Sequence, residues 1–317
     1  MPRLPSITCP DCQQTIVSRD EPINAPLKYG DCLRQCEPCG NGFSNANTGK
    51  VEQLTIILRD PFSHVPAHIA EGWEDVFAQA LNKINGESKP TKIASLNSED
   101  HVTWTVFRYL QERKYLRSCL SALNLDWLAS TTEEPTLLLW GVPIPLGDAK
   151  GKMVCDVVVR VLDMMGEKQE RRSEPDVILD FGQAGLIFIE VKLKSPNDSG
   201  EANERWQKYF NGSTPSLSSQ SFVNVEAIRQ SGLYELTRNW RIAWDLARER
   251  PMALVNLGPE RLFQGQAVAA KLDQFQGALA QSPTRRFIPV TWKTLLRSIP
   301  HQEEWFERYT KRRIESA

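Results

Sequence analysis

The sequence predicts an α/β protein with a central mixed β-sheet and a small metal-binding module at the N-terminus. Five of the seven cysteines lie in the first forty residues, in a segment rich in Pro, Gly and Asn. Beyond that segment, apolar runs of strand length alternate with segments of helical periodicity, the pattern of a sheet covered by helices. With 317 residues, 41% of them apolar, the chain is long enough to bury one large core or two moderate ones.

The N-terminal cysteines form two CxxC turns, CPDC and CEPC. Zinc prefers four tetrahedral ligands, and each CxxC turn presents two thiolates to one ion. We therefore expect a Zn²⁺ ion bound by Cys9, Cys12, Cys36 and Cys39, with Cys32 as an alternative ligand. Four cysteines leave no open position on the ion, which indicates a structural role. The module resembles a zinc ribbon, a class that often binds nucleic acid or a protein partner.

The next stretch of the chain contains one expected strand and two expected helices. Residues 51–58 read as a strand, and residues 65–84 have an apolar stripe at helical spacing. Residues 85–92, NGESKPTK, are polar and contain Gly and Pro, which is typical of a linker. Residues 98–123 are expected to form a long helix with Ser98 as its N-cap.

The second half of the chain supplies most of the expected sheet. Residues 136–144 and 153–165 read as strands, and residues 222–250 as a strong helix or a helix pair. Residues 252–257 and 286–292 are the last expected strands, with a helical segment between them. The order of helices and strands favours a mixed sheet.

The charge and motif content excludes several classes of protein. The 38 basic residues nearly balance the 39 acidic ones, so any charged partner must meet a local patch. No signal-peptide core and no membrane-spanning apolar run is evident, and we expect a soluble, cytoplasmic protein without a membrane partner. Dinucleotide-binding, P-loop and nucleophile-elbow motifs are absent from the sequence.

The stretch EPDVILDFGQAGLIFIEVKLK, residues 174–194, places charges within two apolar runs. Side chains alternate along a strand, so Glu190 and Lys192 point to one face while the apolar residues between them point to the core. The two runs are expected to form an antiparallel hairpin. Asp176 lies opposite Glu190 only if the loop is odd and centred on Gln183, or if a bulge intervenes.

Two carboxylates held close together repel each other unless a cation lies between them, and Mg²⁺ prefers carboxylate and water oxygens. A lysine beside such an ion can orient or deprotonate a metal-bound water and stabilise charge on a phosphate. The pattern therefore indicates metal-assisted hydrolysis of a phosphodiester. The alternative is an edge hairpin with a solvated charged face.

Pro175-Asp176 followed by Glu190-Val191-Lys192 on an apolar strand resembles the PD-(D/E)xK motif of restriction-endonuclease-like nucleases. The resemblance covers roughly residues 95–295 and implies the restriction-endonuclease-like core. It implies that Asp176, Glu190 and the Val191 carbonyl bind Mg²⁺ or Mn²⁺, and that Lys192 is the catalytic lysine.

Three further residues match features of this superfamily. Glu99, at the start of the first core helix, matches an acid that many members place near the metal; it could equally be an acid that serves the helix dipole. Gln230 and Tyr234 form QxxxY, similar to the extra motif of the RecB-like branch, and we expect them one turn apart on one helix face. Ordinary positions on an amphipathic helix are the alternative for both.

The resemblance implies that the partner is nucleic acid, DNA rather than RNA, and that the role is restriction or defence against foreign DNA. Basic residues that include Arg205 and Lys208 alternate with aromatic ones, which suits phosphate contact and base stacking. The aromatic residues are Trp206, Tyr209, Trp240 and Trp244, and core packing of the tryptophans is the alternative. The alternatives are a non-cleaving binding module, an RNA-processing nuclease and, for assembly, a homodimer. We expect a zinc ribbon over 1–48, a strand-helix connector and linker over 49–92, and a nuclease-like domain over 93–317.

Overall fold

The computed structural model describes residues 3–20, 28–81, 83–84, 87–88, 92–167, 172–197, 206–211 and 220–315. The chain forms two compact units. The cysteine unit comprises Met1–Ala70, Pro90–Thr105 and Glu303–Ala317, and the sheet unit comprises Glu71–Lys89 and Val106–Gln302. Boundaries at residues 48 and 92 would divide the chain into consecutive segments. Each observed unit instead combines segments that are distant in sequence.

The cysteine unit begins with two small antiparallel sheets. One is the hairpin of β1 (Ile7–Thr8) and β2 (Thr15–Ile16); the other contains β3 (Arg34–Cys36), β4 (Asn41–Phe43) and β5 (Ile56–Leu58). The expected strand over 51–58 is therefore shorter, because a 3₁₀ turn occupies its first half. The apolar cluster between the sheets is small, so these sheets depend on other cross-links as well. Its members are Ile7, Ile16, Phe43 and Leu54 together with the cysteines.

Helices complete the cysteine unit: α1 (Ala67–Ala70), the first part of α3 (Glu99–Glu112), and α13 (Glu304–Thr310), followed by a π-helical turn, Lys311–Glu315. The Ser98 hydroxyl accepts a hydrogen bond from the amide of His101 at 3.1 Å, which confirms the expected N-cap. The His101 ring is buried, and its Nε2 donates to the Pro61 carbonyl at 2.8 Å. Its Nδ1 then accepts from the Tyr309 hydroxyl at 2.6 Å.

The sheet unit is built on six strands in the order β13-β12-β11-β10-β8-β9. The β11, β12 and β13 strands are parallel, and the remaining neighbours are antiparallel, so the predicted mixed sheet is confirmed. The strands are β8 (Thr136–Leu139), β9 (Val142–Ile144), β10 (Val177–Asp180), β11 (Leu186–Val191), β12 (Met252–Gly258) and β13 (Arg285–Thr291).

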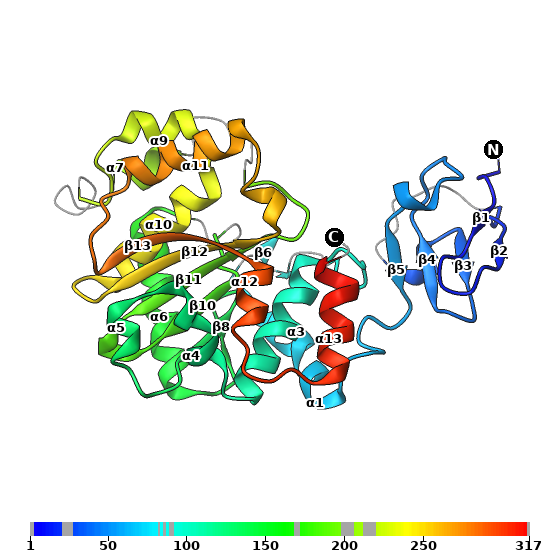
Figure 1. The fold of residues 1–317 in the computed structure, drawn as a ribbon, viewed down its shortest axis with the longest axis horizontal. Helices are drawn as coiled ribbons and strands as arrows, with labels where there is room; N and C mark the ends of the chain where they lie inside the picture. The colour runs from blue at the N-terminus through cyan, green and yellow to red at the C-terminus, as the bar shows by residue number, and fades with distance from the viewer. Residues whose placement is uncertain are drawn as a thin grey trace. The chain divides into compact units, whose positions relative to one another are not determined.

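One face of this sheet packs against α6 (Ala149–Met164) and α10 (Tyr234–Ala247). Phe188 and Leu254 are register partners on β11 and β12 and belong to the core cluster under these helices. The shorter helices α7, α9 and α11 extend that layer, with α9 and α11 lying side by side (Figure 1). Their bounds are α7 (Gln207–Asn211), α9 (Val225–Ser231) and α11 (Gln266–Ala278).

Further short elements belong to the sheet unit. The helices are α2 (Trp73–Gln79), α4 (Leu116–Cys119), α5 (Asp126–Ala129) and α12 (Trp292–Arg297). A two-residue strand, β6 (Lys83–Ile84), pairs with β7 (Glu87–Ser88); β6 lies at the end of the segment expected to be helical, and β7 lies within the expected linker. Among the described residues, no helix is both long enough and apolar enough to cross a membrane.

Several predicted elements were wrong in type or length. Residues 153–165 are not a strand but part of α6, whose N-cap Asp148 accepts from the Gly151 amide at 2.7 Å. The Val-rich sequence suits a strand, but the packing surface under α10 selects the helix. The expected helix over 65–84 is divided into α1 and α2 near Gly72, whose φ is 85°. The alternative of a helix pair over 222–250 is confirmed, because α9 ends and α10 begins around Gly232, whose φ is 72°. The helix that starts after Ser98 ends at Glu112.

Candidate functional site

The hairpin of β10 and β11 has the register that the acidic pair requires. Val177 is opposite Ile189 and Asp180 is opposite Leu186, so the next pair in the register is Asp176 and Glu190. A five-residue connection centred on Gln183 joins the strands, with a 3₁₀ turn over Gly182–Ala184. The predicted odd loop is confirmed.

Glu190 is buried, with 3% of its surface exposed, and both of its carboxylate oxygens are held. Oε1 lies 2.6 Å from the Lys192 ammonium, and Oε2 accepts from the Asn239 amide at 2.5 Å. Burial alone would raise the pKa of Glu190, but the positive charges of Lys192 and Arg238 lower it below its ordinary value. The carboxylate is therefore ionised.

Lys192 lies between two carboxylates. Its Nζ is 2.6 Å from Glu190 and 2.7 Å from Oε2 of Glu235, on the first turn of α10. Burial lowers the pKa of Lys192, but Glu190, Glu235 and Asp176 together raise it above the ordinary lysine value. The side chain is thus an ammonium ion in a carboxylate cage.

Asp176 forms the more exposed edge of this group. Its Oδ2 accepts a hydrogen bond from the Val191 amide at 2.8 Å, and its own carbonyl accepts from the Trp140 amide at 3.1 Å. The residue is half-buried, and the Glu235 side chain is 27% exposed, whereas Glu190 and Lys192 are buried. Solvent therefore approaches the group from the side of Asp176 and Glu235. The Val191 carbonyl as a metal ligand stays a prediction.

Two asparagines of the site were not predicted. Asn239 lies one turn after Glu235 on α10, and Arg238 Nε donates to its Oδ1 at 3.2 Å, which directs its NH₂ group to Glu190. Asn256 is the register partner of Glu190 on β12 and is fully buried. A polar residue inside the apolar run MALVNLG was a visible signal for Asn256. Asn239 could not be recognised in the same way, because polar residues are ordinary on an amphipathic helix.

The expectation that Gln230 and Tyr234 lie on one helix face is wrong. Gln230 is exposed near the end of α9, where it donates to Glu226 at 3.3 Å and accepts from Gln274 at 3.1 Å. Tyr234 begins α10 after the break at Gly232, and it is buried. The catalytic role of each residue stays a prediction.

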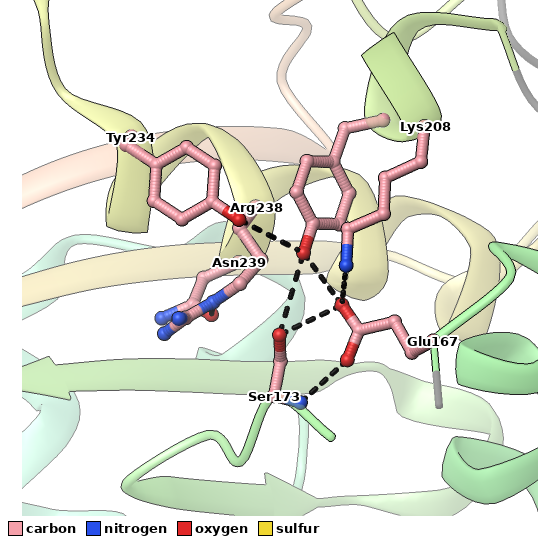
Figure 2. Close-up of polar contacts among 7 residues, drawn as sticks. Glu167, Ser173, Lys208, Tyr234, Arg238 and Asn239 are labelled. Atoms are coloured by element: carbon pink, nitrogen blue, oxygen red, sulfur yellow. Dashed lines mark hydrogen bonds and ion pairs between the residues drawn. The ribbon is translucent and has the colours of Figure 1, made fainter. Parts of the chain in front are cut away.

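A buried polar network lies beside α10 (Figure 2). Glu167 Oε1 accepts from the Tyr209 hydroxyl at 2.5 Å, from the Ser173 hydroxyl at 2.7 Å and from Lys208 at 3.1 Å. Tyr234 donates to the Tyr209 hydroxyl at 3.5 Å. Burial favours the protonated form of Glu167, but the Ser173 amide, Tyr209 and Lys208 lower its pKa below the ordinary value. The network therefore holds an ionised carboxylate in the core.

Two further sequence expectations concern nucleic-acid contact and Glu99. The aromatic residues proposed for base stacking are core residues, so that role is wrong for them: Trp206, Tyr209, Trp240 and Trp244. Arg205 lies outside the described residues, and Lys208 binds Glu167. Glu99 lies in the first turn of α3, in the part that belongs to the cysteine unit, and its catalytic role stays a prediction.

The four predicted cysteines do come together. The Sγ atoms of Cys9, Cys12, Cys36 and Cys39 all lie within 4.8 Å of one another, and within the described ranges no other group of three or more His, Cys, Asp or Glu does so. Cys9 and Cys12 flank the turn between β1 and β2, and the second pair flanks the turn between β3 and β4. Cys32 is buried outside the cluster, with its thiol directed to the Lys28 carbonyl. The cluster can bind a metal such as zinc.

A buried arginine cross-links the same unit. Arg34 is fully buried, and its guanidinium donates to four backbone carbonyls. Nη1 binds Thr48 at 2.7 Å and Pro5 at 3.3 Å, while Nη2 binds Ser44 at 2.7 Å and Ala46 at 2.8 Å. The chain before β1 and the loop after β4 are thereby tied to β3.

In the part of the chain that the structure describes, the cysteine cluster and the group around Glu190 differ in their ligand chemistry. Four thiols suit a soft, tetrahedral ion, whereas two carboxylates with a lysine suit a hard ion and a phosphate. Comparisons with protein-family models, with curated proteins and with solved structures found no match for this chain.

Proposed function

We propose that the sheet unit is a divalent-metal-dependent nuclease that hydrolyses phosphodiester bonds of DNA. The observation that carries the proposal is the register of β10 and β11, which sets Asp176 opposite Glu190 with Lys192 on the same face as Glu190. A mixed sheet with an antiparallel hairpin followed by a parallel strand also agrees with the fold that the PD-(D/E)xK resemblance implies.

The residues fit Mg²⁺ or Mn²⁺. Both ions prefer oxygen ligands, and Asp176, Glu190 and the amide oxygen of Asn256 supply oxygens from three adjacent strands or strand ends. Asn256 is fully buried and has no hydrogen-bond partner for its amide in the described structure, as expected for a side chain that meets a bound group. When bound, such an ion polarises the phosphate and activates a water molecule.

The chain itself supplies charge and position. Lys192 is held as an ammonium ion by Glu190 and Glu235, so it stabilises negative charge on a phosphate and does not act as a base. Glu235 keeps this cation beside Glu190 when a metal ion shares the carboxylate. The half-exposed Asp176 and Glu235 mark the side from which the phosphate reaches the site.

Residues 1–48 of the cysteine unit are proposed to be a zinc ribbon with a structural Zn²⁺ ion. Its apolar cluster is small, and metal binding supplies folding free energy to such modules. Binding of nucleic acid or of a protein partner through this unit is a further part of the proposal, as is a role in defence against foreign DNA.

A cleavage assay tests the proposed function. Single- and double-stranded DNA and RNA are incubated with wild type and with Asp176→Ala, Glu190→Gln and Lys192→Ala, in Mg²⁺, Mn²⁺ or EDTA. We expect metal-dependent cleavage of DNA and a loss of about 10² or more in each variant. Lys152→Ala, which removes an exposed charge on α6, is the matched control and should cut like wild type.

The other outcomes are equally informative. Cleavage that survives all three substitutions excludes the proposed site. Cleavage of RNA alone indicates an RNA-processing nuclease, and binding of nucleic acid without cleavage indicates a binding module.

A further inference from the structure

Asn256 is an unexplained polar residue in the centre of the sheet unit. Its side chain is fully buried, and neither Oδ1 nor Nδ2 has a hydrogen-bond partner in the described residues. Buried amides are almost always paired, because an unpaired amide loses its bonds to water without replacement. Its placement therefore has a cost in stability that the folded chain alone does not offset.

The position of Asn256 indicates what its amide meets. Neighbours in register on parallel strands point to the same face, so Asn256 and Glu190 lie side by side, facing α10. The preceding pair on that face, Phe188 and Leu254, is in the core cluster under the helices, so the two polar residues lie where that cluster ends. The next residue on that face is Lys192, which directly follows the end of β11.

The hydrogen bonds of Glu190 strengthen this assignment. Each Glu190 oxygen already accepts one hydrogen bond, from Lys192 or from Asn239, and a carboxylate oxygen has room for one more contact. An ion that shares Glu190 therefore needs further oxygen ligands nearby. The Asn256 oxygen is adjacent and has no partner with which the ion would compete.

We propose that Asn256 is a ligand-contacting residue of the metal site: its amide oxygen binds the divalent ion held by Glu190, or a water on that ion. This inference rests on the proposed function and extends it to a residue outside the PD-(D/E)xK pattern. It also explains why a polar residue interrupts the apolar strand MALVNLG.

The test compares stability without metal and affinity for Mn²⁺. Asn256→Leu keeps the branched shape and the number of side-chain heavy atoms but removes the amide. In EDTA we expect its melting temperature to equal or exceed that of wild type, since an unpaired buried group is lost. By calorimetric titration we expect its Mn²⁺ affinity to fall by about tenfold or more. Thr237→Val is the control: it is a buried polar-to-apolar change on α10, where the Thr237 hydroxyl donates to the Leu233 carbonyl, and it should bind Mn²⁺ like wild type.

A second variant gives the opposite pattern. Asn256→Asp places a carboxylate beside Glu190, so its melting temperature in EDTA should fall below that of wild type. Added Mn²⁺ should then raise its melting temperature by more than it raises that of wild type. This variant decides the matter if Asn256→Leu fails to fold.

The outcomes separate this inference from the function on which it rests. Wild type that binds Mn²⁺, with Asn256→Leu binding equally well or Asn256→Asp showing no larger shift, overturns the role of Asn256 and leaves the nuclease proposal intact. Wild type that binds no Mn²⁺ outside the cysteine cluster overturns both.

Discussion

Lys192 and Asn239 bind opposite oxygens of the buried Glu190 carboxylate, with Nζ 2.6 Å from Oε1 and Nδ2 2.5 Å from Oε2. The carboxylate is thus fixed by a cation from its own strand and by an amide from α10. The orientation of Glu190 depends on a helix that the sequence motif does not include.

Replacing Asn239 with Leu should therefore destabilise the protein. The substitution leaves one oxygen of a buried, ionised carboxylate without a donor, which costs about 2–3 kcal/mol of the free energy of unfolding. Urea denaturation of the metal-free protein measures this change. Thr237→Val on the same helix removes only a hydroxyl bonded to the Leu233 carbonyl and should cost about 1 kcal/mol. Equal losses for both variants would contradict the role given to Asn239.

The network of Figure 2 predicts different effects for two tyrosines. Tyr209→Phe removes the 2.5 Å hydrogen bond to the ionised Glu167 and should cost about 1.5–3 kcal/mol of the free energy of unfolding. Tyr234→Phe removes a 3.5 Å contact between two hydroxyls and should cost less than about 1 kcal/mol. Denaturant titration measures the free energy of unfolding of both variants. A larger decrease for Tyr234→Phe than for Tyr209→Phe would contradict the prediction.

Metal removal should affect the cysteine unit. We expect one Zn²⁺ ion per chain by elemental analysis, and loss of that ion in Cys9→Ser and Cys36→Ser. Cys32→Ser is the matched control, since Cys32 is buried in the same unit but lies outside the cluster. A strong chelator should lower the melting temperature of wild type, because metal binding contributes to folding. Retention of zinc in Cys9→Ser with loss in Cys32→Ser would assign the ligands differently.

The buried His101 predicts a pH dependence of stability. Burial, with the positive charge of Arg313 nearby, holds the pKa of His101 well below its ordinary value. The unfolded chain therefore binds a proton that the folded chain does not, once the pH falls below about 6.5. The free energy of unfolding should then decrease by up to about 1.4 kcal/mol for each pH unit down to the folded-state pKa.

Denaturation between pH 7 and pH 5 measures this decrease. His101→Gln should show a shallower decrease than wild type, whatever its stability at pH 7. His64→Gln, at an exposed histidine of the same unit, is the control and should keep the slope of wild type. Parallel profiles for wild type and His101→Gln would show that His101 is not the source.

The sequence was most informative about the β10–β11 hairpin. Pairing of Asp176 with Glu190 requires an odd loop centred on Gln183 or a bulge, and this requirement predicted the register although both strands are largely continuous apolar runs. The α6 segment was misread as a strand because valines suit strands, whereas it is a helix that packs against α10. Gly232 broke an otherwise continuous helical pattern, and this moved Gln230 away from Tyr234.

The supporting residues of the site could not be predicted for a different reason. Asn239 and Glu235 reach Glu190 and Lys192 only because α10 crosses β11, a long-range contact that leaves no local pattern. Asn256 becomes a neighbour of Glu190 through the parallel pairing of β11 and β12, which depends on the crossover between those strands.

The guanidinium of Arg34 bears on the arrangement of the cysteine unit when no metal is bound. Because it ties Pro5 and the loop of Ser44, Ala46 and Thr48 to one strand without any ion, part of the unit keeps its shape when the thiols are empty. The two CxxC turns then stay close in space, and an incoming ion meets ligands that are already near one another.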